Sequence, residues 1–106
     1  MIPVNTPLLE GNEKKYLAEC IDTGWISSEG PFVKKFEDSF INRLGRKHAI
    51  ALSNGSAALE VAFTAIGIKS GDEVILPTFT IISCISPLIR IGAIPIFVDV
   101  DIQNWN

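Results

Sequence analysis

Apolar positions recur at helical spacing in the first part of the chain. Between Asn12 and Asp22 they stand three or four residues apart, which predicts a helix that Asn12 can cap and Gly24 can end. A second helix is predicted to begin near Pro31 and to stop at Gly45. Its wide apolar face is rich in phenylalanine, and such a stripe is typical of core packing, so we expect this face to be buried.

The pattern changes after the second helix to short apolar runs that alternate with helical segments. The predicted strands lie at 48–52, 73–76 and 94–100, and the predicted helices at 56–66 and 80–90. Pro87 should kink or shorten the last helix, because it removes an amide donor and crowds the preceding turn. This alternation favours an α/β fold with a parallel sheet, in which the two leading helices pack outside the sheet or against a partner.

Composition and charge narrow the function classes. The 106 residues carry a net charge of −3 without a basic stripe, which argues against a nucleic-acid partner. The apolar stretch at 81–91 is too short and too interrupted to span a bilayer, and no signal peptide is visible, so we expect a cytoplasmic protein. Cys20 and Cys84 match no metal-ligand spacing and are expected to be reduced, partly buried thiols.

A turn of small residues, Ser53 to Leu59, follows the first predicted strand. The first amides of a helix have no intrahelical acceptor, and the helix dipole adds positive potential there. Small side chains let a phosphate approach those amides, and Ser56 can add its hydroxyl. The turn matches neither a Walker sequence nor a Gly-x-Gly-x-x-Gly fingerprint. An ordinary helix cap with a close helix–sheet contact is the alternative interpretation.

A second loop, Pro77 to Ile81, follows the second predicted strand. Ligands of open α/β sheets gather at the carboxyl ends of the strands, so this loop would stand beside the small-residue turn if the two strands are close. Thr78 and Thr80 offer hydroxyls, while Phe79 and Ile81 offer apolar surface. A helix cap with core packing is again the alternative.

Several stretches, in order and spanning nearly all of the chain, resemble one family of enzymes. The matching stretches are 2–4, 23–30, 53–59, 71–75, 77–80, 92–95 and 98–101. They resemble the DegT/DnrJ/EryC1/StrS aminotransferases, which act on nucleotide-linked keto-sugars, and in particular the perosamine-synthase-like members. The resemblance implies a fold-type I transferase that uses pyridoxal 5'-phosphate (PLP), with residues 1–106 forming the N-terminal, incomplete part of its large domain.

The resemblance also implies roles for particular residues. Ser56 and Ala57 would grip the cofactor phosphate, and Gly55 would shape the turn. Ile81 stands where the family usually stacks an aromatic residue on the pyridine ring, so it would cover the ring by dispersion alone. Trp25 and Ser27 lie in a stretch that family members place near the sugar nucleotide, often across a dimer interface. For Trp25, a plain core role is the alternative.

Catalysis by such an enzyme also needs a Schiff-base lysine and an acid partner for the pyridinium nitrogen. The resemblance places both downstream of residue 106, and none of the six lysines here matches the family lysine. Each of the six is predicted to be a solvated surface charge. We therefore assign no catalytic residue and no metal ligand, and we expect the chain to be inactive alone. His48 has no partner to act with and is predicted to be structural or exposed.

The resemblance has a consequence for folding. In fold-type I enzymes, strands supplied later in the chain separate the first strand from the next two. We therefore expect the chain alone to be unstable, dimeric or rearranged, because unpaired strand edges and bare apolar faces favour aggregation.

Three hypotheses follow for function. The first is part of a sugar aminotransferase that uses glutamate, acts as a homodimer and serves amino-sugar and surface-polysaccharide (O-antigen) synthesis. The second is a small α/β module that binds a phosphorylated ligand without chemistry. The third is an interaction protein whose two leading helices dock on a partner.

Overall fold

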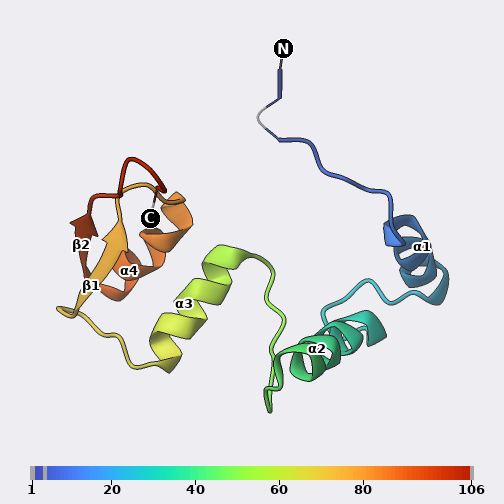
Figure 1. Cartoon of the computed structure of the whole chain (residues 1–106). Coiled ribbons are helices and arrows are strands. Elements are labelled where there is room, and N and C mark those ends of the chain that lie inside the picture. Colours follow the sequence, from blue (N-terminus) through green and yellow to red (C-terminus); the bar gives the residue numbers. More distant parts are fainter. Residues whose placement is uncertain (1, 4, 106) are drawn as a thin grey trace. The chain divides into compact units, whose positions relative to one another are not determined.

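The computed structural model describes residues 2–3 and 5–105 (Figure 1). Contacts between residues divide the chain into two compact units, Met1–Ala51 and Leu52–Asn106. The single incomplete domain expected over residues 1–106 stays a prediction.

The first unit contains α1 (Glu13–Thr23) and α2 (Pro31–Leu44). Gly24 ends α1 with a φ of 72°, the left-handed conformation predicted for it, and its amide donates to the Ile21 carbonyl at 3.1 Å. The predicted cap at Asn12 is wrong in one respect. Asn12 precedes the helix, but its side chain accepts no hydrogen bond from the first turn.

The second helix has the predicted ends, but its aromatic face is more exposed than expected. Pro31 occupies its first turn, and Gly45 ends it in the left-handed conformation. Phe32 packs against Tyr16 of α1 with ring centroids 5.1 Å apart. However, neither helix has a buried residue, and Phe36 is 55% exposed. The expectation that this aromatic face is buried is therefore wrong for the first unit by itself, where Tyr16 covers only part of the face.

The second unit holds the sheet and the buried core. It contains α3 (Gly55–Ala65), β1 (Glu73–Pro77), the short 3₁₀ helix η1 (Ile82–Cys84), α4 (Ser86–Ile91) and β2 (Ile94–Val98). The two strands pair in parallel with Glu73 opposite Ile94. The core consists of Leu76, Leu88 and Ala93, with Phe63 of α3 among the side chains packed against it.

The structure corrects the predicted number of strands. Residues 48–52 form no strand, so two strands replace the three expected. A strand requires a neighbour to satisfy its backbone groups, and here the Ala51 amide instead donates to the Glu37 carboxylate at 2.9 Å. Pro87 shortens the last predicted helix as expected, because α4 begins only at Ser86 and η1 stands apart before it.

The sheet is only partly covered within its own unit. Leu76 points to the core, whereas its partner Phe97 and its neighbour Ile75 are exposed, Ile75 by 73%. Parallel sheets in proteins are normally covered on both faces. The exposed part of this sheet is therefore the kind of surface on which a second layer packs.

Candidate functional site

Helix α3 begins as the sequence predicts, at the turn of small residues. Asn54 is extended, and its side-chain oxygen accepts a hydrogen bond from the Ala57 amide at 2.9 Å. The Asn54 carbonyl accepts from the Ala58 amide at 3.1 Å. The Ala57 amide, predicted as a phosphate donor, is therefore already engaged by a helix cap, which was the alternative interpretation of this turn.

The two preceding amides, those of Gly55 and Ser56, remain available in the part of the chain that the structure describes. They belong to the first turn and have no intrahelical acceptor. A side-chain carbon added at Gly55 would meet nothing within 4 Å, so the turn is open to an approaching group. The hydroxyl of the half-buried Ser56 adjoins these amides in sequence. These groups fit a phosphate, whose oxygens accept hydrogen bonds.

The position of this turn within the second unit also fits a ligand site. Figure 1 shows α3 running opposite to β1 and β2, so its first turn lies toward the carboxyl ends of the strands. Ligands of open α/β sheets gather at that end. There the Thr78 amide donates to the Val98 carbonyl at 2.9 Å, and the Thr78 hydroxyl lies 3.4 Å from the Asp99 carboxylate. These contacts join the two loops that leave the sheet.

The loop after β1 presents Ile81 to solvent. Ile81 is 67% exposed and immediately precedes η1, which contacts α3. The ring of the neighbouring Phe79 packs edge-on against the Trp105 ring, with centroids 5.1 Å apart.

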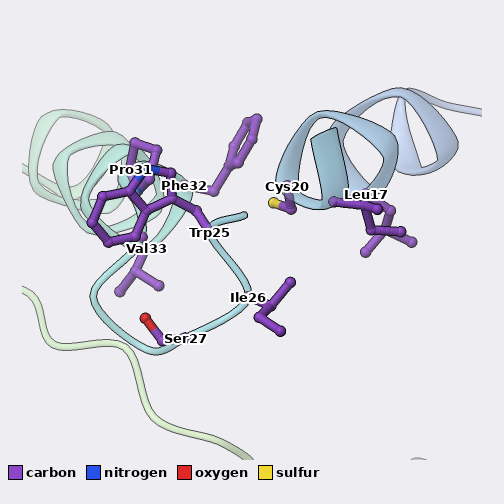
Figure 2. Close-up of a pocket in the computed structure, with 10 residues that line it drawn as sticks. Leu17, Cys20, Trp25, Ile26, Ser27, Pro31, Phe32 and Val33 are labelled. Carbon is purple, nitrogen blue, oxygen red and sulfur yellow. The ribbon is translucent and has the colours of Figure 1, made fainter. Parts of the chain in front are cut away.

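The two residues predicted to lie near the substrate line one pocket in the first unit. Figure 2 shows this pocket between the end of α1, the loop that carries Trp25 and Ser27, and the first turn of α2. Its volume is about 330 Å³. Gly30 is buried beneath it, and a side-chain carbon there would lie 3.5 Å from Trp25 Cβ. Trp25 itself is 49% exposed, so it is not a buried core residue of this chain.

An ion pair that the sequence analysis missed joins α3 to α4. Both Nε and Nη2 of Arg90 donate to Glu60 Oε2, at 3.1 and 2.6 Å. Thirty positions separate the two residues, so no sequence spacing signals the contact. Its only trace in the sequence is that α3 contains a single charged residue.

Other candidate chemistry is sparse. All six lysines are exposed, as predicted, and so is His48. Cys20 and Cys84 are free and half-buried, also as predicted. Within residues 2–3 and 5–105, no group of three or more His, Cys, Asp or Glu side chains is placed to hold a metal ion. No helix in the same residues has the length and apolar character needed to cross a membrane.

The parallel strands and their helices match part of the solved structures of fold-type I PLP aminotransferases. A solved structure of GDP-4-keto-6-deoxymannose-3-dehydratase with a trapped PLP–glutamate geminal diamine matches 98% of this chain and 28% of that chain. The match has a TM-score of 0.85 at 29% sequence identity. A sequence model of the DegT/DnrJ/EryC1/StrS aminotransferase family matches residues 7–106. The chain therefore belongs to that family, which confirms the resemblance.

Curated relatives narrow the comparison within the family. The GDP-perosamine synthase of Vibrio cholerae is 48% identical over 101 residues, which is 95% of this chain and 28% of that enzyme. The GDP-perosamine synthase of Escherichia coli O157:H7 is 47% identical over 104 residues, 98% of this chain and 29% of that enzyme. This chain thus spans less than a third of the length of these relatives.

Proposed function

We propose that this chain supplies the cofactor-phosphate site and part of the substrate wall of a PLP-dependent sugar aminotransferase. The reaction would move the amino group of glutamate to a keto-sugar carried on GDP. The observation that carries the proposal is the family match over residues 7–106, together with an open helix start near the carboxyl ends of the strands.

The second unit would hold the cofactor. The Gly55 and Ser56 amides and the Ser56 hydroxyl would donate hydrogen bonds to the phosphate. The Ala57 amide would join them only if it leaves the Asn54 side chain. Ile81 would cover the ring with its exposed aliphatic surface. Bound PLP supplies an electron sink for amino-group transfer, whereas the protein supplies binding and orientation.

The first unit would contribute to substrate binding. Trp25 offers a half-exposed indole and Ser27 a hydroxyl, and both line the pocket of about 330 Å³. An aromatic face beside a polar group suits a sugar nucleotide, which has both apolar and hydrogen-bonding surfaces. In the proposed enzyme this wall belongs to a homodimer in the cytoplasm that serves surface-polysaccharide synthesis.

The amine that binds the cofactor covalently would come from outside these 106 residues. Five of the six lysines belong to the first unit, where Lys34 pairs with Asp38 and Lys35 lies over the Phe32 ring. Lys69 is the lysine of the second unit, and it precedes β1, at the end of the strand opposite to Thr78. The proposal therefore assigns no catalytic lysine to this chain.

The proposal is tested by titrating the full chain with PLP and measuring bound ligand by equilibrium dialysis. Ser56→Asp should weaken binding at least about tenfold, because a carboxylate about 4 Å from a phosphate is repelled. The same substitution should preserve α3, since an acidic residue in the first turn favours a helix. Far-ultraviolet circular dichroism checks that the helix remains.

A matched control separates the local effect from a change in net charge. Thr6→Asp adds the same charge in an exposed, extended segment of the other unit and should leave PLP affinity unchanged. Equal loss of affinity in both variants, or no saturable binding by the unsubstituted chain, would refute the phosphate site. A further outcome is PLP binding without amino transfer, even after the rest of a full-length family member is added as a separate chain. That outcome would favour the non-catalytic binding module.

A further inference from the structure

The charge of the chain is distributed unevenly between its two units. Residues 1–51 contain seven cationic and seven anionic side chains, whereas residues 52–106 contain two cations and five carboxylates. The whole net charge of −3 therefore lies in the unit proposed to bind a phosphate. Such a surplus opposes anion binding, because like charges repel over several ångströms at moderate ionic strength.

Glu60 is the carboxylate that α3 itself carries, one turn after the proposed site. It follows Ser56 by four residues in α3, so the two side chains lie on one side of the helix, about 6 Å apart along its axis. Helical side chains also lean toward the N-terminus, which directs Glu60 toward the first turn. Ala57 and Glu60 moreover line the same hollow of about 430 Å³ along α3.

Arg90 neutralises the negative charge of the Glu60 carboxylate. Its Nε and Nη2 both donate to Glu60 Oε2, and such hydrogen bonds between charged groups are among the stronger ones in proteins. Arg90 is one of only two cationic residues in positions 52–106. The other, Lys69, precedes β1, and its backbone amide donates to Asp72. Among the described residues, no other ion pair to Glu60 is present.

We propose that Arg90 is a positioning residue for the anion site at the start of α3, because it neutralises and holds the Glu60 carboxylate that would otherwise repel the ligand phosphate. This role rests on the proposed function of the first turn of α3. It adds to that function a residue that does not touch the ligand and that lies in a different helix.

A purely structural role for the ion pair makes a different prediction. If the pair only fastens α3 to α4, removing either partner weakens ligand binding to the same degree. An electrostatic role predicts opposite signs, because Arg90→Gln leaves a bare anion near the site, whereas Glu60→Gln leaves a bare cation. The double variant Glu60→Gln/Arg90→Gln restores neutrality and should bind like the unsubstituted chain.

The experiment measures dissociation constants of inorganic phosphate and of PLP for the full chain and the three variants at low ionic strength. Arg90→Gln should weaken binding about threefold and Glu60→Gln should tighten it about as much, the size expected for one charge roughly 8 Å from a phosphate. Both differences should disappear near 1 M salt, where the screening length is about 3 Å.

The outcomes distinguish this role from the proposed function. Equal weakening in both single variants, or differences that persist at high salt, would overturn the electrostatic role of Arg90 and leave the phosphate site standing. Absence of phosphate and PLP binding in the unsubstituted chain would overturn the site itself. If Arg90→Gln fails to fold, Glu60→Gln alone decides, since only the electrostatic role predicts tighter binding.

Discussion

The two units of the chain reach their structures by different means. Residues 1–51 form two helices from local signals: apolar periodicity, Pro31 in a first turn, and left-handed glycines at 24 and 45. No residue of these helices is buried. Residues 52–106 form paired strands and a small core at Leu76, Leu88 and Ala93, which depend on contacts between segments distant in sequence.

The difference shows how much of a fold can form before its core is complete. Isolated helices are marginal in water, and most of their stability in proteins comes from packing of the apolar face. The helices of the first unit therefore depend on a covering surface that their own unit supplies only in part. The second unit carries its own core, although Ile75 and Phe97 of its sheet remain exposed. We expect the second unit to respond sharply to core substitutions and the first unit to be insensitive to them.

The largest expected effect is at Leu88, which is 1% exposed. Leu88→Ala should destabilise the second unit by about 3 kcal/mol, the loss typical of a large-to-small change in a core. Ile89→Ala, at the exposed next position of α4, should cost less than about 1 kcal/mol. Amide hydrogen exchange should show lost protection in β1 and unchanged exchange in α2. Equal effects of the two substitutions would mean that α4 is covered on both sides in solution.

The next effect compares left-handed glycines in the two units. Gly92 has a φ of 82°, and an added side-chain carbon would stand 2.8 Å from Ser70 Oγ. Gly24 has a φ of 72° with nothing within 4 Å. Gly92→Ala should therefore cost about 2 kcal/mol or more, and Gly24→Ala only about 1 kcal/mol, because only the first adds a clash to the backbone strain. Denaturant unfolding measures both, and similar costs would show that Ser70 moves aside freely.

The same division explains what the sequence predicted and what it did not. The ends of α2 and the start of α3 depend on residues within one turn of each other, and the sequence placed them to within about one residue. The strand at 48–52 failed because a strand needs a partner, which periodicity alone cannot supply. The aromatic face of α2 was predicted to be buried because it is rich in phenylalanine. Burial, however, depends on which other residues pack against the face.

The candidate site divides in the same way. The open turn at Gly55 and Ser56 follows from local sequence, as does the capping preference of Asn54. The helix cap was the alternative interpretation of this turn, but the sequence alone does not tell which amide of the first turn the cap engages. Contacts that join distant segments, such as Glu60 to Arg90 and Thr78 to Asp99, have no signature in spacing and required the structure.

The smallest expected loss of stability is at Glu37. It tests whether a contact between residues distant in sequence stabilises the first unit. Glu37 accepts from the Ala51 amide, fourteen residues away and partly buried, whereas its neighbour Asp38 only pairs with Lys34 on the exposed side of α2. Glu37→Gln should cost about 1 kcal/mol and speed exchange of the Ala51 amide, because a charged acceptor is replaced by a neutral one. Asp38→Asn should cost at most about 0.5 kcal/mol, the worth of an exposed pair four residues apart in a helix. If Glu37→Gln leaves exchange of the Ala51 amide unchanged, the contact between Glu37 and Ala51 does not hold the segment after α2 in solution.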